Sequence, residues 1–372
     1  MMIQSSVCDV VIYGGGIAGA VLARQLSSEA NVVLVDPLDY FEVPMAAPRN
    51  LVKPEFARQA IIPFAKAMPA VDHRVGRLTE LTHAGGFVEQ ADGNRVLLNP
   101  RVSVLATGSG FANELMRGKA GNAVDRQAFY QHFHKRLASA ERILLIGGGP
   151  IGVEVAGEIT ETWPQKRVTL VESGPRILAG SSDGVSARAA AFLESKGATI
   201  LTGQRIEALP SSPQEIFAEG GNARTTAGNL VEYDLAIWCI GGRPNTAYMK
   251  QHFANVLTSE ERIMVGADLR VKGEDSIFAI GDITNLAENK MAYHIKGQVK
   301  VAAANIQAIL AGRQPPASYT PRTGDPTMVV TLGSRAGVAH LPLFGDTEWS
   351  WLIRKAKAKD MLVPKYAKAV SG

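Results

Sequence analysis

A chain of 372 residues that is 46% hydrophobic and 20% charged can bury substantial cores, and its length allows two or three compact units. Its formal net charge of +4 is small for this length, so nucleic acid is not expected as a partner. No apolar run approaches the roughly twenty residues that span a bilayer, and residues 1–8 lack the pattern of a secretory signal, so we expect a cytoplasmic location in which any membrane contact is peripheral.

The first predicted element is a buried parallel strand over residues 7–13, continuously apolar except for Asp9. It leads directly into a G-x-G-x-x-G sequence, and a helical pattern follows over residues 20–28. In such a loop the glycines permit a tight turn, a close backbone approach to a pyrophosphate and close helix packing, and the helix amides meet the phosphates. A second strand, 31–35, ends in Asp36, whose carboxylate would bind an adenosine ribose. We therefore predict a dinucleotide-binding loop formed by Gly14, Gly16, Ile17, Ala18 and Gly19.

The same pattern returns in the middle of the chain. A predicted strand, 142–146, leads into a second G-x-G-x-x-G, followed by a helix over 151–162 and a strand over 167–171. That strand ends in Glu172, which would repel a 2′-phosphate, so we predict NADH in preference to NADPH. Arg176 lies close by and could bind a phosphate, which leaves NADPH open. The second loop consists of Gly147, Gly149, Pro150, Ile151 and Gly152.

Glu154 is expected near the start of the second loop's helix, where the helix dipole favours a carboxylate. One interpretation is an ordinary acid near a helix start. The other is that Glu154 faces the nicotinamide end of the dinucleotide and helps to orient it.

Two later segments suggest how the units are joined. A predicted strand over 230–240 ends in the turn Gly241-Gly242, which would close the internal unit. The apolar run 276–280 then ends in Gly281-Asp282, which would present a carboxylate at the edge of a sheet where ligands bind. We therefore expect an α/β fold with two Rossmann-like dinucleotide-binding domains, the second inserted into the first. The expected boundaries are 1–110 and 244–320 for the first domain, 111–243 for the inserted domain and 321–372 for a small C-terminal segment.

The two cysteines, Cys8 and Cys239, both lie in apolar runs that resemble buried strands. Many NAD(P)H-dependent flavoenzymes pass electrons through a closely spaced cysteine pair beside the flavin. No such pair exists in this sequence.

The motifs together resemble those of the pyridine-nucleotide-dependent flavoprotein oxidoreductases, over nearly the whole chain. These motifs are residues 14–19, 105–108, 147–152, 241–245 and 280–282. The resemblance implies an FAD domain that is split by an NAD(P)H domain. Three shorter segments, 46–49, 290–293 and 332–338, look like the apoptosis-inducing-factor-like group, whose ferroptosis-suppressor branch reduces quinones.

The resemblance also implies roles for single residues. The first loop and Asp36 would bind the ADP half of FAD, and Arg49 would lie along its pyrophosphate. Val75 would contact the adenine, although an ordinary strand residue fits that position equally well. The remaining FAD contacts would come from Ala106, Thr107, Gly108, Gly281 and Asp282, and, near the isoalloxazine at the start of a helix over 293–310, from Lys290, Met291 and Ala292.

The implied reaction is hydride transfer from NADH to FAD, followed by delivery of two electrons to a quinone or another small acceptor. Glu154 and Lys290 are the residues expected beside the reacting groups, although Lys290 could be a solvated lysine at a helix start. His294 is expected to be an ordinary helical histidine rather than a proton relay. Two alternatives remain open: reduction of a protein or radical acceptor, such as a rubredoxin, ferredoxin or monodehydroascorbate, and a non-catalytic redox-sensing module. A homodimer is also left open.

The last segment, residues 327–368, mixes aromatic and aliphatic residues with basic ones. It could rest on an anionic membrane surface and shape a tunnel for a lipophilic ring. Alternatively, it is a helix that covers the FAD domain with its lysines in solvent. The basic residues are Arg354, Lys355, Lys357, Lys359, Lys365 and Lys368.

Overall fold

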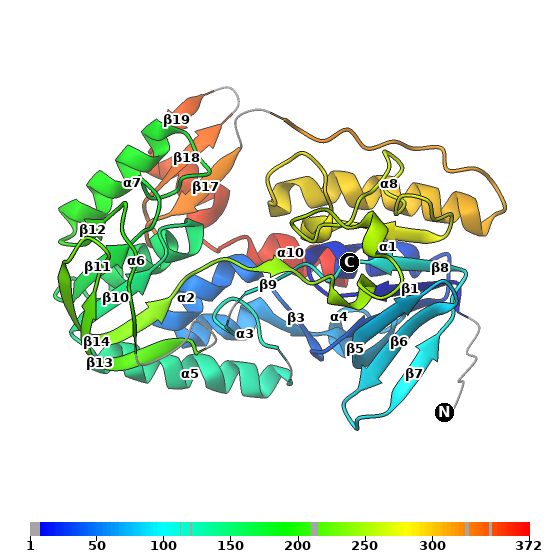
Figure 1. The fold of residues 1–372 in the computed structure, drawn as a ribbon, viewed down its shortest axis with the longest axis horizontal. Helices are drawn as coiled ribbons and strands as arrows, with labels where there is room; N and C mark the ends of the chain where they lie inside the picture. The colour runs from blue at the N-terminus through cyan, green and yellow to red at the C-terminus, as the bar shows by residue number, and fades with distance from the viewer. Residues whose placement is uncertain (1–7, 112, 120, 210–214, 324–326, 342–343) are drawn as a thin grey trace.

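The computed structural model describes residues 8–111, 113–119, 121–209, 215–323, 327–341 and 344–372. Two parallel-stranded sheets stand side by side, one in each half of the molecule (Figure 1). The first sheet contains strands that precede residue 106 and one strand, β16 (Ile277–Ala279), that follows the second sheet in the sequence, whereas the second sheet contains only strands from between them. The expected α/β fold, with one dinucleotide-binding domain inserted into the other, is therefore confirmed.

The first sheet combines five parallel strands with an antiparallel extension. Its strand order is β16 (Ile277–Ala279), β8 (Val102–Leu105), β1 (Val10–Tyr13), β2 (Val32–Asp36), β5 (Asp72–Thr82), β6 (Gly85–Gln90) and β7 (Arg95–Leu98). One face is covered by three helices that share a hydrophobic core with β1, β2 and β8. These helices are α1 (Ile17–Leu26), α8 (Ala292–Leu310) and α10 (Val363–Ser371).

Short elements complete the first domain. They are the strands β3 (Tyr40–Glu42) and β4 (Ile61–Pro63) and the helices α2 (Ala47–Val52), α3 (Ala57–Ala60) and α4 (Phe64–Ala67). The second face of the sheet packs against residues 248–283, which contribute Tyr248, Phe253 and Ile263 to a separate hydrophobic cluster.

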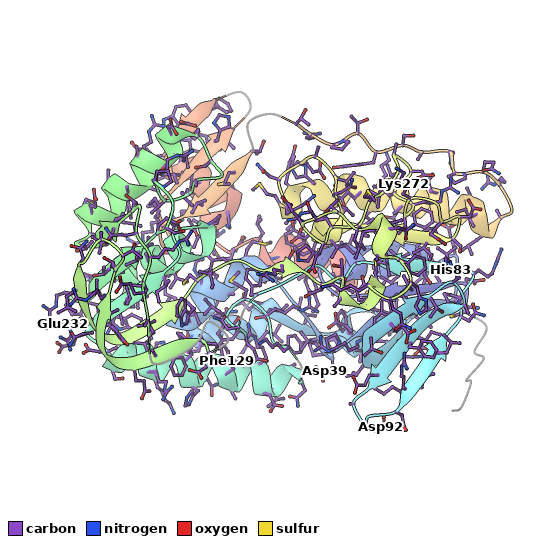
Figure 2. The ribbon with its side chains drawn as sticks, in the orientation of Figure 1. Asp39, His83, Asp92, Phe129, Glu232 and Lys272 are labelled. Atoms are coloured by element: carbon purple, nitrogen blue, oxygen red, sulfur yellow. The ribbon has the colours of Figure 1, made fainter. Side chains whose placement is uncertain are left out.

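The inserted domain has the strand order β12 (Thr199–Leu201), β11 (Arg167–Val171), β10 (Arg142–Ile146), β14 (Leu230–Trp238) and β13 (Phe217–Arg224). The helices α5 (Ala123–Ser139), α6 (Pro150–Thr162) and α7 (Asp183–Ser195) share one apolar cluster with this sheet. That cluster also includes Tyr40, Leu51 and Ile61 of the first domain, so the two domains share an apolar core. Asp39, labelled in Figure 2, reinforces the junction because its Oδ1 accepts a hydrogen bond from the backbone N–H of Ala123.

The two chain crossings between the domains run side by side. β9 (Ser109–Gly110) pairs antiparallel with β15 (Arg243–Pro244). A Cβ on Gly242 would lie 1.7 Å from the carbonyl oxygen of Gly110, so only glycine allows this approach. The expected boundaries at residues 110 and 243 lie in this ribbon.

The C-terminal segment contacts both domains (Figure 1). Its small sheet, β17 (Met328–Thr331), β18 (Gly337–Leu341) and β19 (Gly345–Thr347), packs on α6 and α7 of the inserted domain. α9 (Ser350–Ile353) and a π-helical turn (Arg354–Ala358) follow, and α10 then returns to pack on α1 of the first domain. The expectation of a helix that covers the first domain with its lysines in solvent is met by α10, whose Lys365 and Lys368 are exposed. The membrane contact stays a prediction. Within the described residues, no helix has the length and hydropathy needed to cross a membrane.

The predicted elements agree with the structure to within a few residues. The strands 142–146 and 167–171 have the predicted bounds, and β14 ends two residues before its predicted end. α1 begins at Ile17, three residues earlier than predicted, because the helix starts directly at the N-cap Gly16. The first part of the predicted strand 7–13 includes Val7, which lies outside the described residues.

Candidate dinucleotide-binding sites

The first glycine loop has the geometry that its motif predicts. Gly14 has a φ of +107°, and a Cβ there would lie 2.3 Å from the carbonyl oxygen of Ala106. A Cβ on Gly19 would lie 1.8 Å from the carbonyl oxygen of Gly14, so α1 can start against the strand only with glycine at this position. At Gly16, by contrast, the single atom near a Cβ would be Nη1 of Arg117, at 3.3 Å. The backbone at Gly16 is thus open on the side where a phosphate would approach.

Asp36 closes the first loop from the end of β2. Its buried carboxylate accepts hydrogen bonds from the N–H of Gly15 at 2.5 Å and of Leu38 at 3.0 Å. It also accepts two from Nη2 of Arg117, at 2.8 and 2.7 Å. Val75 is the register partner of Asp36 on the neighbouring strand β5, and its side chain is 38% exposed. An apolar surface therefore lies beside the acid, as contact with an adenine would require.

The second loop repeats this geometry. Gly147 has a φ of +110°, and a Cβ on Gly152 would lie 1.9 Å from the carbonyl oxygen of Gly147. A Cβ on Gly149 would meet no atom within 4 Å. Glu172 accepts hydrogen bonds from the N–H groups of Gly148 and Gly174, both at 2.6 Å. In both domains, the acid at the end of the second strand thus holds the middle glycine of the loop.

These features fit the dinucleotides that the loops predict. The second glycine leaves open space above the backbone at Gly149, and at Gly16 only the end of the Arg117 side chain lies near. A helix N-terminus follows each loop at once. Pro150 at the start of α6 suits this position because it has no N–H to leave unpaired. Each loop could therefore hold a pyrophosphate with its amides.

Residues 106–108 follow β8 beside the first loop, and residues 241–242 lie at the chain crossing, where Gly242 packs on Gly110. The Thr107 hydroxyl donates to the carbonyl oxygen of Asn245 at 2.7 Å and lies 2.9 Å from the Tyr248 hydroxyl. Gly108 has a φ of +65°, which favours glycine. Gly241 has no atom within 4 Å of a Cβ position, whereas Gly242 is packed against Gly110.

Gly281 and Asp282 follow β16 at the carboxyl edge of the first sheet. Gly281 has a φ of +81°, and its N–H donates to Oε1 of Gln298 on α8 at 2.7 Å. Burial raises the pKa of the Asp282 carboxyl, and the nearby charges of Lys290 and Arg262 oppose that shift. Among the described residues, no hydrogen bond to this carboxylate is found.

Lys290 lies in the loop between Asp282 and α8. Its Nζ donates to the carbonyl oxygen of Leu286 at 2.8 Å, and burial lowers its pKa. It lines an open cavity of about 470 Å³ together with Arg262 and Arg322. It is therefore half-buried and not the fully solvated lysine of the alternative interpretation.

Met291 and Ala292 begin α8, Met291 as the N-cap. Met291 packs against the apolar cluster of the inserted domain, whereas Ala292 packs against that of the first domain. The start of α8 therefore lies where both domains meet. His294, also on this helix, lies 3.4 Å from the Glu288 carboxylate without a hydrogen bond to it.

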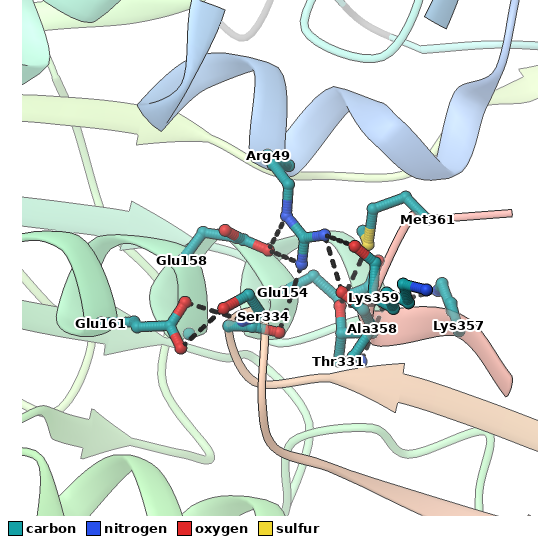
Figure 3. A network of polar contacts seen from close by, with 12 residues as sticks. Arg49, Glu154, Glu158, Glu161, Thr331, Ser334, Lys357, Ala358, Lys359 and Met361 are labelled. Carbon is teal, nitrogen blue, oxygen red and sulfur yellow. Dashed lines mark hydrogen bonds and ion pairs between the residues drawn. The ribbon is translucent and has the colours of Figure 1, made fainter. Parts of the chain in front are cut away.

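The structure gives Arg49 partners other than a pyrophosphate, which corrects its expected role. Its guanidinium forms an ion pair with Glu158 of α6 and donates to the carbonyl oxygens of Gly333, Ala358 and Lys359 (Figure 3). Because these contacts use the donors of its Nε, Nη1 and Nη2, none remains for a phosphate. The sequence pattern around Arg49 could not show this, because its partners lie more than 100 residues away.

Glu154 also faces the C-terminal segment (Figure 3). It is the fifth residue of α6 and lies just beyond the first turn in which it was expected. Its Oε1 accepts hydrogen bonds from the N–H and hydroxyl of Thr331, both at 3.0 Å, and from Nζ of Lys357 at 2.5 Å. In the structure Glu154 is thus a buried acid that is paired with the C-terminal segment, and its role in orienting the nicotinamide stays a prediction.

Sequence reasoning missed Arg117, Glu158 and the partner role of Lys357. Arg117 lies in a stretch without a motif, between β9 and α5, and nothing local distinguishes it. A signal did exist for Glu158, because Glu154, Glu158 and Glu161 recur at helical spacing on α6, and Glu161 accepts a hydrogen bond from the N–H of Ser334. Acids on the buried face of a helix require partners.

The prediction of two buried, unpaired cysteines is confirmed. Burial raises the pKa of the Cys239 thiol to about 12 and also raises that of Cys8. Cys239 lies behind the second loop, where a Cβ on Gly152 would be 3.4 Å from its own Cβ. The two cysteines do not form a thiol pair of the kind that relays electrons beside a flavin.

Comparison with known proteins agrees with this geometry. Residues 8–308 match the model of the family described as pyridine nucleotide-disulphide oxidoreductase. Ferroptosis suppressor protein 1 of Taeniopygia guttata is 30% identical, covering 96% of this chain and 94% of its own. Apoptosis-inducing factor homolog B of Dictyostelium discoideum is 26% identical, covering 96% and 95%. Among solved structures, a ferredoxin reductase of Rhodopseudomonas palustris superposes with a TM-score of 0.65 at 20% identity, covering 89% and 87% of the two chains, and so shares the fold.

Proposed function

Because the chain belongs to the pyridine nucleotide-disulphide oxidoreductase family, it is an FAD-dependent NAD(P)H oxidoreductase, and we propose that it delivers the electrons of NADH to a quinone. The observation that carries the proposal is the repeated hydrogen bond from a loop glycine to a strand-end acid, Gly15 to Asp36 and Gly148 to Glu172. Two loops of the same construction supply two nucleotide sites in one chain.

We propose that the first loop binds FAD and the second binds NADH. The strand β16 returns to the sheet of the first loop and brings Gly281 and Asp282 to its ligand-binding edge. Lys290, Met291 and Ala292 would then lie near the isoalloxazine. We further propose the domain boundaries 1–110 with 244–320, 111–243 and 321–372.

The preference for NADH rests on Glu172 and on the contacts of Arg176. Nη1 and Nη2 of Arg176 donate to the carbonyl oxygens of Leu178, Ala179 and Ser181, and its Nε lies 3.1 Å from Asp183. The guanidinium is therefore already engaged, which supports an unphosphorylated ribose at Glu172.

Bound flavin would supply the hydride chemistry. The contribution of the protein is alignment, because hydride transfer needs a near-attack geometry. Met291 supports this arrangement, because it packs against the apolar cluster through which the inserted domain contacts the first domain.

Quinone is the proposed acceptor because the chain has no redox-active thiol pair and resembles the ferroptosis suppressor proteins over nearly its whole length. The test mixes flavin-loaded protein with NADH and a short-chain quinone and follows NADH absorbance. Rapid oxidation that depends on the quinone is expected. Oxidation only with a protein acceptor, falling steeply with salt, would favour the alternative, and slow turnover with every acceptor would favour a sensing module.

We also propose that an aromatic patch, formed by Phe344, Trp349 and Trp351, contacts a membrane surface. These side chains are 58%, 51% and 66% exposed, and the rings of Phe344 and Trp349 pack edge to face. The exposed residues Arg354, Lys355 and Lys359 follow directly and would attract anionic lipid headgroups. Such a contact would place the enzyme where lipophilic quinones are found.

Sedimentation with vesicles tests this patch. Binding to vesicles that contain anionic phosphatidylglycerol is expected, and a double variant, W349S/W351S, should lose most of it. L230S is the matched control, because Leu230 is an equally exposed side chain (60%) in the inserted domain. Equal binding by the double variant and the control would contradict the proposed contact.

A further inference from the structure

The side chain of Arg117 lies across the first glycine loop. Its Nη2 contacts both oxygens of Asp36, and its Nη1 lies 3.3 Å from the position of a Cβ on Gly16. The guanidinium therefore reaches from Asp36, which would bind a ribose, to Gly16, where a pyrophosphate would lie.

The acceptor positions of Asp36 are filled in this arrangement. A carboxylate offers about four lone-pair sites, and the N–H groups of Gly15 and Leu38 and the two contacts from Arg117 occupy four. Ribose hydroxyls can therefore bond to Asp36 only if they replace Arg117. Nε and Nη1 of Arg117, in turn, have no acceptor among the described residues, so the guanidinium has donors to spare.

The backbone that carries Arg117 is firmly anchored. Leu115 and Met116 are buried, and Arg126 donates to the carbonyl oxygens of Glu114 and Leu115. On the other side, Arg77 donates to the carbonyl oxygen of Lys119. The position of the guanidinium over the loop is therefore set by the packing of this segment.

The second loop provides an internal comparison. Among the described residues, Glu172 accepts hydrogen bonds from Gly148 of the loop and from Ser173 and Gly174, the two residues that follow it. In the part of the chain that the structure describes, no cationic side chain pairs with Glu172, because the nearby Arg176 donates its hydrogen bonds to backbone carbonyl oxygens. A cation over the loop is thus not part of the shared motif but a feature of the first site.

We propose that Arg117 is a binding residue for the dinucleotide at the first loop and changes partners when the dinucleotide binds. The ribose hydroxyls take its place on Asp36, and the released guanidinium bonds to a phosphate of the ADP half. This inference rests on the proposed assignment of FAD to the first loop. It names a contact that the glycine motif alone does not provide.

The test measures FAD binding to flavin-stripped protein, by equilibrium titration and by the dissociation rate, in the wild type and in Arg117→Met. Loss of a charged hydrogen bond should weaken FAD binding by about tenfold to a hundredfold, mainly through faster dissociation. The dependence of FAD affinity on salt should also flatten, while the affinity for NADH stays unchanged. Arg117→Lys keeps the charge without the planar fork and should fall between the two.

Arg136→Met is the matched control, because the side chains of Arg117 and Arg136 are each 33% exposed and each pairs with one acid. It should bind FAD as the wild type does. Equal or tighter FAD binding by Arg117→Met would overturn the inference. A wild type that does not bind FAD would overturn the proposed function instead, so the two failures are distinguishable.

The same Arg117→Met substitution in an Asp36→Asn variant distinguishes two roles of Arg117: direct contact with a phosphate, and neutralisation of the charge of Asp36. If Arg117 bonds to a phosphate, Arg117→Met should still weaken FAD binding when Asp36 is replaced by Asn. If its effect disappears in that background, Arg117 acts only through Asp36, and the phosphate contact is wrong.

Discussion

Arg49 and Glu158 form an ion pair in the interior of the protein, with 2.7 Å between Nη2 and Oε1, although they are 109 positions apart in the sequence. Arg49 belongs to α2 of the first domain and Glu158 to α6 of the inserted domain, and Arg49 also bonds to the C-terminal segment. A single guanidinium therefore joins all three parts of the chain (Figure 3).

Replacing Arg49 with Met should lower the free energy of unfolding by about 3–5 kcal/mol, because a buried carboxylate then loses its partner. The double variant R49M/E158L should recover most of that loss, since it buries two apolar groups instead. Chemical denaturation measures both. Equal destabilisation in the single and double variants would show that the ion pair itself is not the cause.

The effect of R49M should also depend on pH. Burial raises the pKa of the Glu158 carboxyl, and Arg49 opposes that shift. A carboxyl whose folded pKa exceeds its unfolded value of about 4.3 favours folding most at low pH, and this contribution is lost as the pH rises through the folded pKa. The difference in stability between wild type and R49M should therefore shrink between pH 7 and pH 5. In proteins that also carry E158Q, the difference in stability between the chain with Arg49 and the chain with R49M should not vary with pH, because no carboxyl titrates at position 158.

Two alanine substitutions in the second loop should have different effects. A Cβ at Gly149 meets no protein atom and the backbone φ there is −69°, so G149A should fold with a stability within about 0.5 kcal/mol of wild type. It should nevertheless bind NADH poorly, because the methyl group takes the place of the pyrophosphate. G152A should lose stability as well, since its Cβ collides with the loop backbone. Normal NADH binding by G149A would contradict the proposed site.

Glu172→Gln should weaken discrimination against NADPH. The amide can still accept the hydrogen bond from Gly148, but the negative charge that opposes a 2′-phosphate is gone. We expect the ratio of kcat/KM for NADH to that for NADPH to fall about tenfold, which corresponds to about 1.4 kcal/mol. Glu219→Gln, at an exposed position in the same domain, is the control. An unchanged ratio would remove Glu172 from the ribose site.

Asp282→Asn should loosen FAD, because this half-buried carboxylate has no hydrogen-bond donor among the described residues and is proposed to receive one from the cofactor. The dissociation constant for FAD should rise about tenfold, while the affinity for NADH stays the same. Flavin fluorescence measures the former. Full flavin retention in this variant would place Asp282 outside the site.

Thiol reagents should leave the enzyme active. With its pKa raised to about 12, Cys239 carries almost no thiolate at neutral pH, and Cys8 is buried as well. Iodoacetamide should therefore not inhibit NADH oxidation under native conditions, and the variant C8A/C239A should remain active if it folds. Rapid inhibition of folded protein would require a reactive cysteine and an electron path that we do not propose.

The sequence by itself determined the two loops and the strands and helices around them. Their geometry depends on residues within one short strand–loop–helix–strand unit: glycines where a Cβ would collide with the backbone, and an acid at the end of the second strand within reach of the loop amides. The tertiary structure alone decided the partners of the long polar side chains. Glu154 meets Lys357 across 203 residues, and Arg117 meets Asp36 across 81. The physical reason is that a buried charge must be paired wherever the fold brings a partner, and local periodicity contains no information about which distant segment that is.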